Sequence, residues 1–472
     1  MRLFPNYQFS ADFHLPTTHQ IAVTLHPKNT GEYHKSMLKR FFAAAVFATA
    51  VSSSALAQGV RTMDINQLFD LIEQNNQTLK TQKTGIEAAR ECVKSAKSQR
   101  LPDINVSLSA SYNGNALLMD RDFTNVQNLS SPHFGNAFSL DAQQVIYAGG
   151  AVNAGIKMAE IGAEQANVVT ELSRQGQRFL ALSQYLDLQK IANREKVLQS
   201  NIELTQKLID NINEKHSQGV ALKNDVTRYE LQLQTLKLNL TKLENTRSIL
   251  NHQLCNTLGI PVSERIEPIE DTTGKSFAKD GEEQWQKDAT AVSPQLKMAQ
   301  LNEDMSLQQE KLAKSELLPK IAVVACNNFN GPITFELPPI DKNLNIWYVG
   351  VGVKYSLSSL FKSNKKLSQA RIATRQAQEQ KALAQEELDN NVQAAYTNYL
   401  QSYVELETQK KNVELANENY QVVNDRYLNQ LALITDMVDA ANMKLDAELS
   451  EVDARINIAY QYYKVRYVAG KL

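Results

Sequence analysis

The sequence predicts a mainly α-helical chain with a small transmembrane β-barrel part and duplicated hairpins of long helices. Three observations predict this fold class: the chain has two similar halves, long proline-free stretches carry a helical period, and short stretches alternate between apolar and polar residues. A repeated half indicates an architecture assembled from copies of one unit. The two kinds of period distinguish the helices from the strands.

Charge balance narrows the possible partners. The 472 residues include 50 Lys and Arg against 51 Asp and Glu, which gives a formal net charge of -1. A balanced chain lacks the basic excess that favours binding to nucleic acid or to an anionic membrane surface. We therefore expect no nucleic-acid partner.

Residues 37–57 have the pattern of a secretory signal peptide. Basic residues precede an apolar run over 41–51, and a small-x-small site ends at Ala57. The run is too short for a membrane-spanning helix, which needs about 20 residues. We predict export, with residues 1–36 as an over-extended start. The alternative for 1–36, a metal-binding tract of four histidines, fits poorly because their spacing matches no helical ligand pair.

The two halves share the order and spacing of their motifs. In the first half, Leu101-Pro102 follows the first predicted helix. In the second half, Leu318-Pro319 follows the corresponding helix at the same interval. Further along, segment 213–225 aligns with segment 424–436. The mature chain is therefore interpreted as a duplication.

Each half has the order helix, Leu-Pro break, two strands, very long helix, short turn and returning helix. The predicted boundaries are a first repeat over 58–260, with a strand hairpin at 103–146 and a helical hairpin at 148–259, a linker over 261–282, and a second repeat over 283–472, with a strand hairpin at 320–358 and a helical hairpin at 360–470.

The helices are predicted from their apolar period. Within 220–258 a heptad seam contains Val226, Leu233, Leu236, Leu240, Leu243, Leu250 and Leu254. A second row, Leu231 and Leu238, lies beside it, so each helix could pack against neighbours on two sides, as staves do in a barrel. The preceding helix, about 148–218, contains no proline and would extend roughly 100 Å. Helices of this length, repeated at 360–429, imply a fibre or a tube.

The strands are predicted from strict alternation. Apolar residues alternate with polar or small residues at Ile104, Val106, Leu108, Ala110 and Tyr112, and again at Trp347, Val349, Val351, Val353, Tyr355 and Leu357. About 10 residues per strand with one oily face is typical of a transmembrane barrel around a wet interior. Segments 134–146 and 321–329 are weaker partners, and 114–133 and 330–344 are the expected external loops.

Four strands cannot close a barrel around water, so we expect the chain to oligomerise and remove its open sheet edges. The alternative is the edge of a soluble β-sandwich. Nothing else in the sequence would then cover the apolar strand faces.

The twice-repeated order of motifs resembles the TolC-like outer membrane efflux protein family, also called outer membrane factors. The joint Tyr147-Ala148-Gly149-Gly150 is similar to the aromatic-then-glycine joint of the family, whereas Leu360-Phe361-Lys362-Ser363 lacks the glycines. The resemblance implies a homotrimer with a trimeric α-barrel in the periplasm and a shared 12-stranded barrel in outer membrane lipid. It also implies a periplasmic adaptor (membrane fusion) protein and an inner-membrane pump at the far end, as in tripartite efflux or type I secretion.

The resemblance assigns roles to residues at the helix turns. Asp436 and Asp439 lie three residues apart on one helical face and match the constricting aspartate rings, or gate, of the family. Taken alone, two aspartates near a helix start are more often solvated partners of the helix dipole. Asp225 and Tyr427 match a latch in which a phenol binds a carboxylate across the tips.

Two departures from the family pattern concern the second turn. Ala432 stands where the family prototype has a latch arginine, and Gln430 stands where it has a glycine, although the first turn keeps Gly219. The residues expected to dock the adaptor are Gly219, Val220, Ala221, Leu222, Leu431, Ala432, Leu433 and Ile434.

No catalytic or cofactor site is predicted. After the signal peptide the only histidines are His133, His216 and His252, far apart, and the sequence contains no glycine-rich phosphate loop or Cys/His metal set. The family resemblance implies instead a passive exit duct that extends from the outer membrane into the periplasm of a Gram-negative type of cell. The alternatives are a trimeric coiled-coil surface adhesin or stalk protein, and a diffusion porin.

Overall fold

The computed structural model describes residues 59–269, 281–336 and 339–472. The predicted signal peptide and the predicted over-extended start lie outside the described residues. Residues Gly59–Leu472 form one compact unit.

Two long unbroken helices organise this unit. Helix α4 spans Ala151–Ser217 (67 residues) and helix α8 spans Ser359–Leu428 (70 residues). These ranges are close to the predicted ranges of 148–218 and 360–429. At 1.5 Å per residue each helix extends about 100 Å. Among the described helices, none is both long and apolar enough to cross a membrane.

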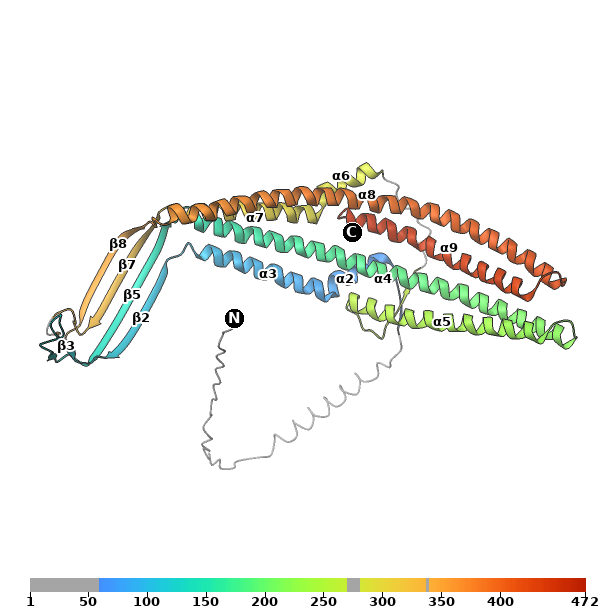
Figure 1. Ribbon diagram of the computed structural model, residues 1–472, viewed down its shortest axis with the longest axis horizontal. Helices are drawn as coiled ribbons and strands as arrows, with labels where there is room; N and C mark the ends of the chain where they lie inside the picture. Colours follow the sequence, from blue (N-terminus) through green and yellow to red (C-terminus); the bar gives the residue numbers. More distant parts are fainter. Residues whose placement is uncertain (1–58, 270–280, 337–338) are drawn as a thin grey trace, which may run out of the picture. The chain divides into compact units, whose positions relative to one another are not determined.

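Shorter helices follow one another along each long helix (Figure 1). Helices α3 (Gln77–Ser98) and α5 (Lys223–Leu258) contact α4. Helices α7 (Pro294–Ser315) and α9 (Ile434–Val468) contact α8, and both also contact α4. Each half of the chain thus supplies one continuous helix and one helix in two pieces.

The end of α5 meets the start of α3 at Gly259. Gly259 has a φ of 66°, and a Cβ atom there would lie 2.7 Å from the carbonyl oxygen of Asn75. The side-chain amide of Asn76 donates to the carbonyl of Thr257 at 2.7 Å. Only glycine accommodates both the left-handed φ and this approach. The corresponding Gly470, after α9, meets Pro294 at the start of α7.

The first predicted helix of each half is divided in two. Helix α2 (Ile65–Asn75) precedes α3, and helix α6 (Glu282–Val292) precedes α7. Asn76 lies between α2 and α3, and its ψ of 125° interrupts the helical backbone there. Its side-chain oxygen accepts a hydrogen bond from the Leu79 amide, so Asn76 is the N-cap of α3. Ser293 caps α7 in the same way, ahead of Pro294.

The strand hairpins form one antiparallel sheet of four strands in the order β2-β5-β7-β8. The strands are β2 (Asp103–Tyr112), β5 (Phe134–Tyr147), β7 (Lys320–Gly331) and β8 (Leu344–Lys354). The central pair β5–β7 joins the two halves of the chain. Strand β8 ends at Lys354, so the prediction that alternation continues to Leu357 was too long.

The apolar face of this sheet is uncovered within the chain. Val106, Leu108 and Trp347 are 66%, 80% and 71% exposed. Because Val106, Leu140 and Trp347 stand in line across the register, these side chains share one face. The expected external connection 114–133 contains the short pair β3 (Ala116–Leu118) and β4 (Gln127–Leu129).

A small parallel pair of strands was not predicted. Strand β1 (Val60–Met63) pairs with β6 (Arg265–Pro268), which lies within the predicted linker. The Tyr185 hydroxyl of α4 donates to the Met63 carbonyl at 2.8 Å, and both side chains belong to a buried cluster with α2 and α5. Residues 270–280 of the linker lie outside the described part of the chain.

The two predicted rows on α5 have different environments. Seam residues Val226, Leu233, Leu236 and Leu254 are buried within the chain. Leu231 and Leu238, in the second row, are 64% and 54% exposed. Full burial of a leucine contributes about 1.5–3 kcal/mol, so the first row stabilises the hairpin and the second remains available to a neighbour.

Candidate functional site at the helix turns

The turn between α4 and α5 has the hydrogen bonds of a Schellman motif. The amide of Val220 donates to the Lys215 carbonyl at 2.9 Å, and the amide of Gly219 donates to the His216 carbonyl at 2.9 Å. Gly219 has a φ of 75°, and no other group would contact a Cβ atom there. The turn therefore requires the left-handed backbone that glycine adopts at no steric cost.

The turn between α8 and α9 repeats this geometry with a different residue. The amide of Leu431 donates to the Arg426 carbonyl at 2.8 Å, and that of Gln430 donates to the Tyr427 carbonyl at 3.0 Å. Gln430 has a φ of 62°. Gln430 therefore adopts the same left-handed backbone conformation as Gly219. For a residue with a side chain, this conformation has a steric cost of about 1–2 kcal/mol.

Asp225 and Asp436 occupy equivalent positions in the two halves. The Leu222 amide donates to the Asp225 carboxylate at 3.3 Å, and the Leu433 amide donates to the Asp436 carboxylate at 3.0 Å. Each carboxylate thereby binds an otherwise unpaired donor at the start of its helix. Within one chain, Asp436 therefore makes the helix-start contact that the alternative interpretation expected.

Asp439 lies one helical turn after Asp436, and both side chains are exposed. On the same face of α9, Asp446 follows Asp439 by one heptad and is also exposed. The aspartates therefore form a row along the exposed side of α9. The geometry leaves this row free to face other copies of the chain.

A shared tip core lies behind the turns. Its residues, contributed by α4, α5, α8 and α9, are Ile209, Ile212, Val226, Tyr229, Leu233, Tyr420, Ile434, Met437 and Ala440. Met437 is fully buried at its centre. Burial raises the pKa of Tyr229, whose buried hydroxyl has no hydrogen-bond partner among the described residues. The two helical hairpins are thus packed together near their turns.

Tyr427 and Asp225, the predicted latch pair, are brought near each other. Burial raises the pKa of Tyr427, and the negative charge of Asp225 raises it further. Lys215 lies over the Tyr427 ring, with its Nζ 6.0 Å from the ring centroid. No hydrogen bond joins the Tyr427 hydroxyl to the Asp225 carboxylate in the described chain.

The residues expected to dock an adaptor differ in how far they are exposed. Val220, Leu222, Leu431 and Leu433 are 54%, 70%, 68% and 70% exposed. Gly219 is also exposed, while Ala221 and Ala432 are partly covered. Ile434 is buried in the tip core, so its side chain supports the turn and does not form part of its surface.

No metal centre was found in the described part of the chain, where no three His, Cys, Asp or Glu side chains are suitably grouped.

The duplicated helical hairpins, the sheet with an uncovered apolar face and the exposed turns define the class of outer membrane channel protomers. The chain belongs to the Outer membrane efflux protein family, which it matches over residues 68–259 and 285–471. No curated protein gives a significant sequence match.

Solved structures of outer membrane channels share the fold. The outer membrane protein VceC from Vibrio cholerae is 13% identical, with a TM-score of 0.71 and coverage of 86% of this chain and 96% of VceC. The CmeC channel of Campylobacter jejuni is 13% identical, with a TM-score of 0.70 and coverage of 86% and 85%. The MtrE channel of Neisseria gonorrhoeae, described in its open state, is 15% identical, with a TM-score of 0.63 and coverage of 86% and 88%.

These findings establish the general function. The chain is an outer membrane channel component of efflux systems, located in the outer membrane. Its family and the similar structures are channels and not enzymes, and they give no support to the adhesin alternative. Proteins of this family are in general trimeric channels that work with adaptor and inner-membrane pump proteins.

Proposed function

We propose that three copies of this chain assemble into one tube, with a shared 12-stranded barrel in outer membrane lipid and a helical tunnel in the periplasm. The observation that carries this proposal is that the four-stranded sheet has two unpaired edges and an uncovered apolar face. Strands β2 and β8 each pair on one side only, and the apolar face between them is uncovered. Open edges and apolar faces are costly in lipid unless the sheet closes.

Within this tube, Asp436 and Asp439 form the gate. Threefold repetition turns each aspartate into a ring of three carboxylates around the axis, which holds cations and narrows the mouth. The exposed row on α9 supports this role, because Asp439 has no partner within the described chain. Asp436 combines the gate with its contact to the start of α9.

Asp225 and Tyr427 form the latch between the two helical hairpins. Their electrostatic coupling supports the pair, and Ala432 leaves the second latch bond of the family prototype without its arginine. The resting mouth is therefore held mainly by the tip core. Opening separates the aspartate rings as the inner helix pairs untwist.

A periplasmic adaptor docks on the exposed turn residues and couples the duct to an inner-membrane pump. The four apolar side chains exposed at the turns, Val220, Leu222, Leu431 and Leu433, support this contact. The sequence contains no phosphate-binding loop, so the pump supplies the energy, in tripartite efflux or in type I secretion. A photo-crosslinker at Leu222 or Leu433 should capture the adaptor, whereas one at Leu108 on the sheet should not.

Single-channel recording tests the gate. The double variant Asp436→Ala with Asp439→Ala should raise the conductance and abolish block by multivalent cations, because both carboxylate rings are lost. Asp446→Ala, one heptad further along the same face, is the matched control and should change both properties less. Unchanged conductance and unchanged block in the double variant would count against the rings.

A further inference from the structure

The joint between strand β8 and helix α8 carries an excess of basic residues. Residues 354–374 contain no Asp or Glu and five cations, which are Lys354, Lys362, Lys365, Lys366 and Arg371. The repeat alignment places this segment over residues 143–163 of the first half, where the only charged residues are Lys157 and Glu160. The formal charge is thus +5 at the second joint and zero at the first. The basic excess therefore belongs to this joint and not to the repeated fold.

The first joint neutralises its charges within the chain. The Lys157 ammonium lies 3.4 Å from the Glu160 carboxylate, and Lys97 of α3 lies 3.3 Å from the same carboxylate. Both cations at this joint therefore have an anionic partner.

The second joint neutralises only part of its charge. The Lys366 ammonium lies 3.0 Å from the Glu316 carboxylate of α7, and the Arg371 guanidinium lies 3.2 Å from Glu310. These two pairs join α8 to α7 and account for both acidic residues of the segment 310–320 that leads into the sheet. The remaining lysines of the joint have no acidic partner there.

Lys362 and Lys365 are the free cations of α8. Both side chains are exposed, and neither forms an ion pair within the part of the chain that the structure describes. Lys354 is also exposed, but its register opposite Lys320 places it on the polar face of the sheet. Lys362 and Lys365 thus remain for a partner outside the chain.

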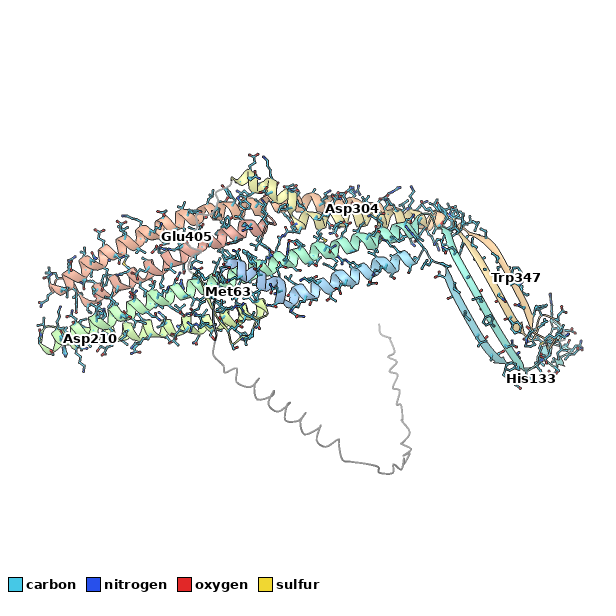
Figure 2. The ribbon with its side chains drawn as sticks, turned by 180° about the vertical axis from the view of Figure 1, so that it is seen from behind. Met63, His133, Asp210, Asp304, Trp347 and Glu405 are labelled. Carbon is cyan, nitrogen blue, oxygen red and sulfur yellow. The ribbon has the colours of Figure 1, made fainter. Side chains whose placement is uncertain are left out.

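Exposed apolar side chains lie beside these two lysines. Leu357, Leu360 and Phe361 are 70%, 50% and 67% exposed. Phe361 precedes Lys365 by four residues, so both lie on one side of α8. These residues directly follow β8, on which Figure 2 labels Trp347 of the uncovered apolar face. Along the chain, the apolar surface therefore ends where the free lysines begin.

This order of side chains is typical of a boundary between lipid and water. Aromatic rings are enriched at the level of the lipid headgroups. Lysine stems lie along apolar surface while their ammonium groups reach the polar layer, where clustered lysines attract anionic headgroups. A phospholipid matches both features, because one molecule supplies a phosphate and an acyl chain. The location of the chain in the outer membrane places such lipid beside the sheet.

We propose that Lys362 and Lys365, together with Phe361, bind anionic phospholipids in the membrane leaflet that borders the periplasm. This inference rests on the proposed function, because the joint reaches the headgroups only if the sheet lies in lipid. The lipid phosphate pairs with the two ammonium groups, and the acyl chains continue along the apolar face of the sheet. The equivalent first joint, which has no free lysine, contributes little to this preference.

A titration with fluorescent lipids tests the proposal on the purified full-length channel in a non-ionic detergent. Labelled phosphatidylglycerol should bind more tightly than labelled phosphatidylcholine, whose headgroup has no net charge. The double variant Lys362→Gln with Lys365→Gln should weaken phosphatidylglycerol binding about 25-fold, because each lysine near an anionic surface contributes a factor of about five. Binding of phosphatidylcholine should not change. Lys362→Arg with Lys365→Arg keeps both charges and should keep the preference.

The matched control is Lys410→Gln with Lys411→Gln. It removes the same charge from exposed positions of α8 about 45 residues further along, which is about 70 Å of helix. This control should bind both lipids like the unmodified channel. An equal loss in the control, or unchanged phosphatidylglycerol binding in the Lys362 and Lys365 variant, would overturn the proposal. Displacement of the lipid by inorganic phosphate beyond that by sodium chloride of equal ionic strength would also overturn it, in favour of a free-phosphate site.

The same samples separate this proposal from the proposed function. A mass of three chains and normal conductance, together with unchanged phosphatidylglycerol binding in the glutamine variant, refute the lipid site and leave the duct intact. A mass of one chain without conductance in the unmodified protein contradicts the tube. The difference in lipid binding between the glutamine and arginine variants still decides the lipid site in that case.

Discussion

The two helix turns solve the same geometric problem with different residues. At the first turn Gly219 takes a φ of 75°, and at the second Gln430 takes a φ of 62°. Both turns close with the same two amide-to-carbonyl hydrogen bonds, and both are followed by an aspartate that binds the first free amide of the next helix. The two turns thus have the same backbone conformation. Only the second turn has a steric cost, because its left-handed residue is a glutamine and not a glycine.

This difference indicates where the second turn obtains its stability. A glutamine in the left-handed region persists only if its surroundings hold it there. The second turn has Ile434 and Met437 immediately behind it, and both are buried in the tip core. The tip core thus packs behind the second turn, as it packs behind the first through Val226 and Tyr229.

The largest effect should come from Met437→Ala, which opens a cavity in the tip core. We expect a loss of about 2–5 kcal/mol in local stability, shared by both turns because the core joins α4, α5, α8 and α9. Amide hydrogen exchange in both turns measures this loss. Loss of protection in the second turn alone would show that the turns are stabilised independently.

Reciprocal substitutions at the left-handed positions should have opposite signs. Gly219→Ala should destabilise the first turn by about 1–2 kcal/mol, and Gln430→Gly should stabilise the second by about 1 kcal/mol. Hydrogen exchange of Val220 and Leu431, whose amides close the turns, reports each effect. The same sign for both substitutions would contradict the strain assigned to Gln430.

Asp225→Ala and Asp436→Ala should cost about 1 kcal/mol each, because each removes an acceptor for a free amide at a helix start. Their effects on local helix fraying should therefore be alike. Only Asp436→Ala should change single-channel cation block, since Asp225 is placed in the latch. Equal changes in block would remove the distinction between gate and latch.

The smallest effect concerns the titration of Tyr427. Its pKa is raised in the folded chain, by burial first and by Asp225 second. The neutral phenol is therefore favoured by folding, so this contribution to stability is complete below the ordinary tyrosine pKa of about 10 and is lost as pH rises through the folded value. Asp225→Asn should lower the pKa of Tyr427 and leave it above the ordinary value, because burial remains.

A difference titration at 295 nm, against Tyr427→Phe in each background, isolates this tyrosine. An unchanged Tyr427 titration in Asp225→Asn would place the carboxylate too far from the phenol to act as a latch.

Features with a local cause were predictable from the sequence. Helix α4 was expected over 148–218 and spans Ala151–Ser217, because a period and the absence of proline are properties of one segment. Alternation at Ile104 to Tyr112 likewise gave strand β2. The repeat alignment of 213–225 with 424–436 already placed Asp225 and Asp436 at equivalent positions, which was the signal for their shared contact with the helix start.

Features with a distant cause were not predictable. Strands β1 and β6 have four residues each and lie about 200 residues apart, so neither carries a recognisable pattern. Their position depends on α4, through the bond from Tyr185 to Met63. The left-handed backbone of Gln430 also escaped prediction, because glutamine has no intrinsic preference for it.

The most direct test of the central claim is electron microscopy of the purified chain in detergent, combined with a mass measurement. We predict particles with threefold symmetry, a mass of three chains, and a tube continued by a short barrel. A single-chain mass in detergent-free buffer, with the four strands packed against a soluble core, would contradict it.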